Sequence, residues 1–149
     1  MTLVSEKSDG MIEYRCQLRV RYADTDAMGV VYYSKYFEYF EVARTELLRA
    51  CGLPYAKIEQ IGFFLPVTKA AAQFIKGATY DELLTILVRM PSYPSPRLEI
   101  TYEIFAANSD LLATGETTLA FVSRATGKPA RPPQEYRDAV EQFKQSNKS

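Results

Sequence analysis

The chain has 149 residues, with 18 basic and 18 acidic side chains, so its formal net charge at pH 7 is zero. Apolar residues make up 47% of it, enough for one domain with a substantial core. The sequence shows neither a basic run for nucleic acid nor an apolar segment of signal-peptide or membrane-spanning length. We expect one domain over residues 1–149, with an ordered core of about 11–143, that is cytoplasmic and inserts into no membrane.

Histidine is absent from the sequence. Its absence excludes Ser-His-Asp and Cys-His catalysis and histidine-ligated metals, so acid–base chemistry falls to carboxylates, Tyr, Lys or Cys. The two cysteines, Cys16 and Cys51, are too few and too far apart for a structural zinc site, and we expect both in the core as reduced thiols. We therefore expect neither a metal nor a redox cofactor.

The first predicted elements are a strand and a long helix. Residues 14–22 alternate between two faces, which indicates a half-buried strand. A helix follows, with Ser34 as its expected N-cap and its end near Gly52. Its apolar residues recur at spacings of three and four: Tyr36, Phe40, Ala43, Leu47 and Ala50.

The rest of the chain reads as a short helix, four strand-like segments and a last helix. The short helix is expected over 55–61, and Pro66 indicates an irregular or edge position within a strand over 63–74. Further strands are expected over 83–90, 98–105 and 112–122, then a helix with Tyr136, Val140 and Phe143 facing inward. Polar residues 1–10 and 145–149 are expected to be mobile. This order predicts an α+β fold, an antiparallel sheet with one helix on a face.

Two carboxylates, Asp24 and Asp26, lie in a loop that contains Gly29, between the first strand and the long helix. A carboxylate just before a helix lies beside unpaired backbone N–H groups, which can stabilise negative charge that develops on a substrate carbonyl. One loop thus offers both a base and an oxyanion site. A turn or capping role explains an Asp in such a loop equally well.

The motif Asp24-Thr25-Asp26-x-x-Gly29-Val30-Val31-Tyr32, followed by Tyr36-Phe37-Glu38-Tyr39-Phe40-Glu41-x-Ala43-Arg44, resembles the 4-hydroxybenzoyl-CoA thioesterase family of hotdog-fold proteins. The resemblance covers about residues 11–143. It implies a hotdog fold, an antiparallel sheet wrapped around one long helix. It also implies hydrolysis of an acyl or aroyl thioester to the free acid and coenzyme A, with no cofactor beyond the CoA of the substrate.

The resemblance also implies roles for residues of the loop. Asp26 matches the catalytic Asp, acting as nucleophile or general base, and Tyr33 matches the residue whose backbone N–H polarises the thioester oxygen. Gly29 and Val31 fall at substrate-binding positions, although a turn that needs φ > 0 also explains Gly29. Asp24 is expected to be structural.

Glu41 is the second candidate carboxylate, because the family's helix supports the site at this position. Its spacing of three from Arg44 also predicts a simple surface ion pair.

Other positions match the substrate channel of the family. Phe64, Leu65 and Pro66 correspond to the segment that lines the acyl pocket from the neighbouring subunit, and core packing explains them equally well. Ser95 and Arg97 match a loop along the pantetheine arm. Further cations that could meet CoA phosphates are Arg89, Arg124, Lys128 and Arg131.

A homo-oligomer is expected, a dimer at least and a homotetramer by preference, because edge strands would otherwise stay unpaired and the family builds its site at the subunit junction. Two other functions stay open: a thioesterase that acts on acyl-carrier protein, and a non-catalytic hotdog module that binds acyl thioesters. The acyl group is not determined, although 1,4-dihydroxy-2-naphthoyl-CoA is an aromatic candidate by resemblance.

Overall fold

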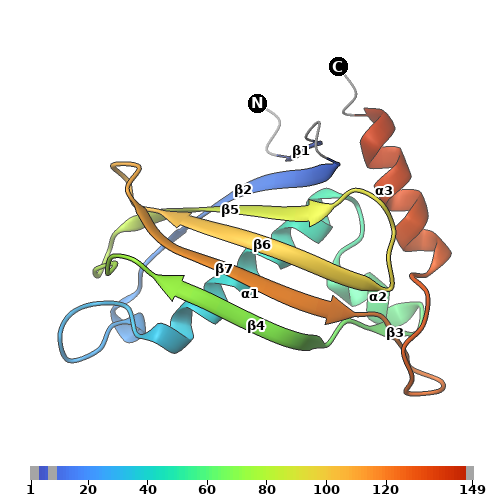
Figure 1. Ribbon diagram of the computed structural model, residues 1–149, viewed down its shortest axis with the longest axis horizontal. Coiled ribbons are helices and arrows are strands. Elements are labelled where there is room, and N and C mark those ends of the chain that lie inside the picture. Colours follow the sequence, from blue (N-terminus) through green and yellow to red (C-terminus); the bar gives the residue numbers. More distant parts are fainter. Residues whose placement is uncertain (1–3, 7–9, 147–149) are drawn as a thin grey trace.

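The computed structural model describes residues 4–6 and 10–146 (Figure 1). Among these residues, no helix has both the length and the apolarity needed to cross a bilayer. The elements in chain order are β1 (Val4–Glu6), β2 (Met11–Arg19), the 3-10 turn η1 (Tyr22–Asp24), α1 (Tyr33–Ala50), α2 (Tyr55–Gln60), β3 (Phe63–Phe64), β4 (Val67–Phe74), β5 (Leu83–Pro91), β6 (Arg97–Phe105), β7 (Leu111–Ala120), β8 (Val122–Ser123) and α3 (Gln134–Ser146).

One antiparallel sheet carries the strand order β1-β2-β5-β6-β7-β4, and α1 runs along one of its faces (Figure 1). β2 precedes α1 in the chain and β4 follows it, yet the two strands lie near opposite edges, so α1 crosses beneath the sheet. β3 and β8 form a separate two-stranded sheet. The expected α+β architecture, with an antiparallel sheet around one long helix, is confirmed.

The core lies between α1 and the sheet. Four of the five residues of the predicted apolar stripe of α1 are buried (Tyr36, Phe40, Ala43 and Leu47), whereas the fifth, Ala50, is exposed. Tyr39 and Leu48 are buried as well. The Phe40 ring stacks on Tyr102 of β6 with centroids 4.4 Å apart. Burial of each such large side chain contributes roughly 1.5–3 kcal/mol to stability, so this stripe fixes α1 against the sheet.

The two ends of α1 differ from each other in how well the sequence predicts them. Gly52 has φ +85°, and Leu53 N–H donates to Leu48 O at 3.0 Å, so the predicted helix end near Gly52 is confirmed. Ser34 is not the N-cap, because the helix begins at Tyr33 and Tyr32 holds the capping position without a side-chain hydrogen bond. The main chain of the preceding loop sets this start, since Tyr32 N–H donates to Asp24 O at 2.9 Å.

The remaining differences concern edges and ends. Val4–Glu6 was expected to be mobile and instead forms β1, paired with β2, while residues 1–3, 7–9 and 147–149 lie outside the described residues. Pro66 separates β3 from the edge strand β4, as predicted. The strand expected over 112–122 is interrupted at Phe121, after which β8 leaves β7 and pairs with β3.

Candidate active site

The loop between η1 and α1 folds as a tight hairpin. Thr25 and Val31 form an antiparallel bridge, Asp26 N–H donates to Val30 O at 2.9 Å, and Gly29 N–H donates to Asp26 O at 3.0 Å. Gly29 has φ +81°, a conformation that side chains disfavour, although a Cβ there would meet no atom within 4 Å. Backbone conformation, and not lack of space, therefore requires glycine at this turn.

The Asp26 carboxylate uses one oxygen to hold this turn and leaves the other available. Oδ1 accepts the N–H of Met28 at 2.8 Å and that of Val30 at 3.4 Å. Oδ2 accepts no hydrogen bond from any part of the chain that the structure describes. Asp26 thus has the turn-stabilising role expected for an Asp in this loop. The hydrogen bonds to Oδ1 fix the carboxylate, and Oδ2 can still contact a water molecule or a carbonyl carbon.

Tyr33 is the first residue of α1, and its N–H has no hydrogen-bond partner among the described residues, whereas Lys35 N–H donates to Tyr32 O at 2.9 Å. Neither a side-chain cap nor an acidic residue in the first turn competes for the Tyr33 N–H. The positive end of the helix can therefore receive negative charge. Asp24 O accepts Tyr32 N–H across the hairpin, so the segments that carry Asp26 and Tyr33 lie side by side.

Val31 has a different environment from the exposed part of this loop. Its side chain is buried in the core, and its N–H donates to Ala78 O at 2.9 Å. Contact of Val31 with substrate stays a prediction.

An aromatic cluster flanks the start of α1. The Tyr33 ring lies 4.7 Å from the Phe74 ring, centroid to centroid, and Phe74 lies 5.1 Å from Tyr36. Tyr32, Tyr33 and Phe74 are all partly exposed, Tyr33 by 63%. The end of the edge strand β4 thereby packs against the N-terminus of α1. Sequence reasoning missed Phe74, because an aromatic residue at the end of a predicted strand does not indicate that it packs against the start of a helix.

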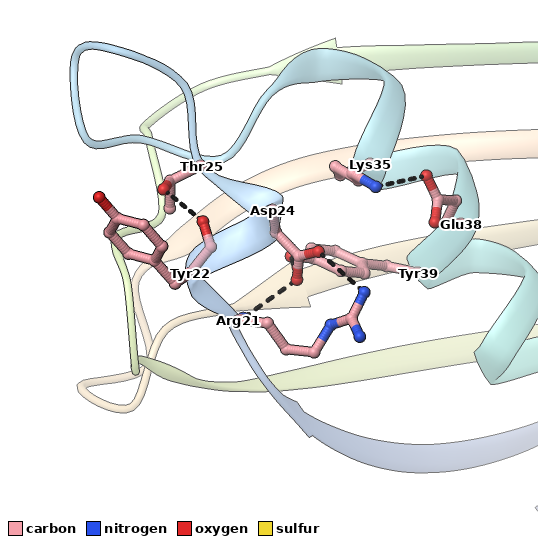
Figure 2. A network of polar contacts seen from close by, with 7 residues as sticks. All are labelled: Arg21, Tyr22, Asp24, Thr25, Lys35, Glu38 and Tyr39. Atoms are coloured by element: carbon pink, nitrogen blue, oxygen red, sulfur yellow. Dashed lines mark hydrogen bonds and ion pairs between the residues drawn. The ribbon is translucent and has the colours of Figure 1, made fainter.

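Asp24 is buried and points toward α1 (Figure 2). Its Oδ2 accepts the Tyr39 hydroxyl at 2.9 Å and the Arg21 backbone N–H at 3.0 Å, and the Arg21 guanidinium lies 3.7 Å from Oδ1. Burial, together with the hydrogen bond to Asp24, raises the pKa of Tyr39 well above its ordinary value. Sequence reasoning missed Tyr39, because nothing in the spacing indicates which helical residue a loop carboxylate will meet.

A cavity of about 380 Å³ lies at the other half of α1, between this helix, Tyr55 of α2 and the ends of β6 and β7. Leu65 lines it, whereas Phe64 lies under the Arg124 guanidinium at 5.2 Å and Pro66 is exposed. Of the three residues predicted to line an acyl pocket, one chain therefore places only Leu65 in this cavity.

Glu41 and Arg44 also line the cavity. Within residues 10–146 they do not form the ion pair that their spacing predicted. The Arg44 guanidinium instead lies near the Tyr102 hydroxyl, where it partly offsets the rise that burial causes in the pKa of Tyr102. The cavity thus combines apolar walls with one cation and one carboxylate.

Ser95 lies in the β5–β6 connection at the same end of the molecule, and Arg97 is the first residue of β6. Between them, Pro96 O accepts Phe121 N–H at 3.1 Å. Arg97 is exposed. Arg89 is held by Glu13 at 2.9 Å and Glu103 at 2.7 Å on the sheet, which argues against a role in binding phosphate.

The two groups of candidate residues lie far apart in one chain. Arg44 is about three turns along α1 from Tyr33, roughly 16 Å at the helical rise per residue. The β5–β6 connection and the Asp26 loop lie at opposite ends of the sheet (Figure 1). A single subunit therefore carries the Asp26 loop and the cavity at two separate places.

Comparison with known proteins identifies the family. The sequence pattern of the thioesterase-like superfamily matches residues 20–140. The acyl-CoA thioester hydrolase YbgC of Escherichia coli O6:H1 is 33% identical over 134 residues, which are 89% of this chain and 96% of that protein. The DHNA-CoA thioesterase of Staphylococcus aureus has a TM-score of 0.81 at 31% identity, covering 91% of this chain and 93% of its own. A 1,4-dihydroxy-2-naphthoyl-CoA thioesterase from Synechocystis has a TM-score of 0.75 at 27% identity, covering 86% and 95%. The hotdog fold is confirmed, and the chain belongs to the thioesterase-like superfamily.

Proposed function

We propose that this protein is an acyl-CoA thioesterase, which hydrolyses an acyl or aroyl thioester to a carboxylic acid and free CoA. The observation that carries the proposal is the fixed carboxylate of Asp26, whose Oδ2 accepts no hydrogen bond from the described residues, in the loop that leads into the N-terminus of α1, where no side chain caps the helix. The names of the relatives, which include an acyl-CoA thioester hydrolase and two thioesterases of aromatic CoA esters, support the same chemistry. The proposed reaction needs water and no cofactor beyond the CoA of the substrate.

In the proposed mechanism the thioester oxygen accepts the Tyr33 N–H, and the helix dipole stabilises the oxyanion of the tetrahedral intermediate. Asp26 takes a proton from the attacking water, or attacks the carbonyl carbon itself to give an anhydride that water then hydrolyses. In either route the C–S bond breaks, the CoA thiolate leaves and takes up a proton, and Asp26 returns to its ionised form. Both routes use the same two groups.

A second copy of the chain completes the site in this proposal. β4 is an edge strand with nearly all its residues exposed and Lys69 as its only charge. Such an edge pairs readily with another strand. Antiparallel pairing of β4 with its own copy sets Val67 of one subunit across from the Phe74 end of the other, and thus brings each cavity toward the partner's Tyr33. A dimer is the minimum assembly, and a tetramer of two such dimers is the expected form.

The substrate proposed for this site carries an aromatic acyl group, as in the 4-hydroxybenzoyl-CoA thioesterases that the motif resembles. Exposed rings of Tyr32, Tyr33 and Phe74 flank the oxyanion site, and aromatic faces pack well on a planar acyl group. The Arg44 guanidinium in the cavity can bind an oxygen at the end of the acyl group that lies away from the thioester. Phe64, Leu65 and Pro66 of the second subunit would line the pocket for this acyl group. The cytoplasmic location stays a prediction.

The test is a panel of aliphatic and aromatic acyl-CoAs, with release of free thiol as the readout. Asp26→Asn should lower kcat by about a hundredfold or more, the scale for loss of a positioned base or nucleophile, and should leave the far-UV spectrum unchanged. Glu41→Gln is the matched carboxylate control and should stay within about threefold of wild type. Loss of activity in Glu41→Gln with normal turnover in Asp26→Asn would reverse the assignment. Binding of acyl-CoA without thiol release would indicate a non-catalytic module.

A further inference from the structure

A buried charge needs partners, and Asp24 has unusually well-defined ones. Only 4% of the residue is exposed, and its carboxylate lies beside Tyr39 of α1 (Figure 2). The Tyr39 hydroxyl donates to it from the second turn of α1, and Arg21 donates its backbone N–H from the strand side. The nearby Lys35–Glu38 ion pair, at 3.2 Å, involves neither Asp24 nor Tyr39.

Asp24 meets α1 at a second point through its main chain. Its carbonyl oxygen accepts the N–H of Tyr32 at 2.9 Å, and Tyr32 is the capping residue of α1. The side chain is thus anchored to the second turn of the helix, and the backbone of the same residue to its start. Two anchors on one rigid helix fix both the position and the direction of the chain that leaves Asp24.

Both candidate catalytic groups depend on these anchors. Asp26 lies two residues beyond Asp24, and Tyr33 lies one residue beyond Tyr32. We propose that Asp24 and Tyr39 are positioning residues, a clamp that sets the Asp26 carboxylate against the Tyr33 N–H. This inference rests on the proposed thioesterase function. A small misplacement of a catalytic group costs up to a hundredfold in rate, so the clamp acts on kcat and not on substrate affinity.

The hydroxyl of Tyr39 is suited to this task. Burial raises the pKa of Tyr39, so the phenol stays protonated and donates to Asp24 across the neutral and mildly alkaline range. The ring also packs edge-to-face on Tyr36 at 5.9 Å between centroids. Removal of the hydroxyl alone therefore loosens the clamp and leaves the ring packing in place.

The decisive variant is Tyr39→Phe, with Tyr136→Phe as the matched control. Tyr136 is also buried, its hydroxyl donates to Met90 Sδ at 3.8 Å, and it belongs to α3, outside the proposed site. Tyr39→Phe should lower kcat about tenfold or more while KM changes less than about twofold. Tyr136→Phe should lose some thermal stability and keep the wild-type kcat. Asp24→Asn, which retains an acceptor for Tyr39, should be less impaired than Asp24→Ala.

The two residues should act as one unit. The double variant Asp24→Ala/Tyr39→Phe should have about the kcat of Asp24→Ala alone, because the second change has no clamp left to break. Amide hydrogen exchange gives a readout that does not need activity: the Tyr32 N–H should exchange about tenfold faster in Tyr39→Phe, and at the wild-type rate in Tyr136→Phe.

The outcomes separate this inference from the function on which it rests. If Asp26→Asn is inactive while Tyr39→Phe keeps the wild-type kcat and merely melts earlier, the pair is only structural and the clamp is wrong. Unchanged exchange of the Tyr32 N–H in Tyr39→Phe would also overturn it. If Asp26→Asn stays active, or wild type releases thiol from no acyl-CoA, the proposed function itself fails.

Discussion

Gly115 of β7 lies directly against the ring of Phe40 of α1. A Cβ at this position would lie 2.3 Å from Phe40 Cζ, and the other face of the contact is occupied because Phe40 stacks on Tyr102. The absence of a side chain at Gly115 thus lets α1 approach the sheet closely. This approach determines where the N-terminus of the helix, and with it Tyr33, lies relative to the sheet.

Gly115→Ala should therefore destabilise the fold by about 1–3 kcal/mol, the usual cost of an added methyl in a packed core. Urea denaturation followed by circular dichroism measures this change in the free energy of unfolding. Gly115→Ala/Phe40→Leu should cost less than the sum of the two single changes, because the smaller side chain makes room. Strict additivity would show that the contact is not the cause.

The proposed pairing of β4 edges can be tested by a charge. Ala71 is exposed near the middle of β4 and lies opposite Glu116 of β7, so a lysine at this position suits the single subunit. In an antiparallel dimer the two lysines come close to the twofold axis and repel. Ala71→Lys should therefore shift the protein from dimer to monomer in sedimentation. In dilute protein solution it should also lower kcat/KM at least about tenfold.

Thr101→Lys is the control for that experiment. Thr101 of β6 is also exposed and also lies opposite Glu116, but within the sheet and away from its edge. It adds the same charge beside the same carboxylate and should keep both the assembly and the activity. A fully active monomer, in wild type or in Ala71→Lys, would contradict the shared site.

Periodicity was sufficient to predict most of the fold, since α1 and the strands β5, β6 and β7 each bury one regular face. It could not predict β1, because pairing at a sheet edge uses the backbone and imposes no pattern on Val4–Glu6. The start of α1 was also missed, because a main-chain hydrogen bond from the loop replaces the expected cap by Ser34.

The candidate site was predictable only where the motif is local. Asp26 and Gly29 lie in one hairpin and Tyr33 begins the helix that follows it, so these residues are neighbours in the sequence as well as in the fold; their roles stay predictions. The contact between Asp24 and Tyr39 joins residues 15 positions apart and depends on how the loop folds back, which spacing does not encode. The direction of Arg44 was missed for a similar reason, since a helical spacing of three allows an ion pair but does not require one.

Stability at alkaline pH provides a separate test of the core. Burial raises the pKa of Cys51 to about 12, from an ordinary value of 9.0. The folded state therefore holds the thiol proton more tightly than the unfolded state does. Cys51 contributes its stabilisation fully below about pH 9 and loses it as the pH rises from 9 to 12.

Cys51→Ala should consequently lose less stability than wild type between pH 8 and pH 10.5, by about 1–2 kcal/mol. The measurement is the free energy of unfolding in urea at the two pH values. The comparison is made between proteins because burial also raises the pKa of several tyrosines, which weaken both proteins alike. Equal losses in the two proteins would show that the Cys51 thiol is not protected by the fold.

Mutation can also distinguish coenzyme A from acyl-carrier protein as the carrier of the acyl group. Arg97 is exposed at the start of β6, so a guanidinium at this place can meet a phosphate of CoA. The chain has no net charge to attract an acidic carrier protein over a wide surface. Arg97→Ala should raise KM for an acyl-CoA about fivefold to tenfold and change kcat less than twofold, as expected for loss of uniform binding.

A matched arginine and a shortened substrate make this test specific. Arg15→Ala removes another exposed arginine, on β2, and should leave KM unchanged. The acyl-pantetheine thioester lacks the nucleotide phosphates, so wild type and Arg97→Ala should hydrolyse it equally well. Free CoA should compete with the acyl-CoA substrate. If the same acyl group on acyl-carrier protein gives a kcat/KM tenfold above that on CoA, a difference of about 1.4 kcal/mol in transition-state stabilisation, the carrier is the protein and the role of Arg97 in reading CoA is wrong.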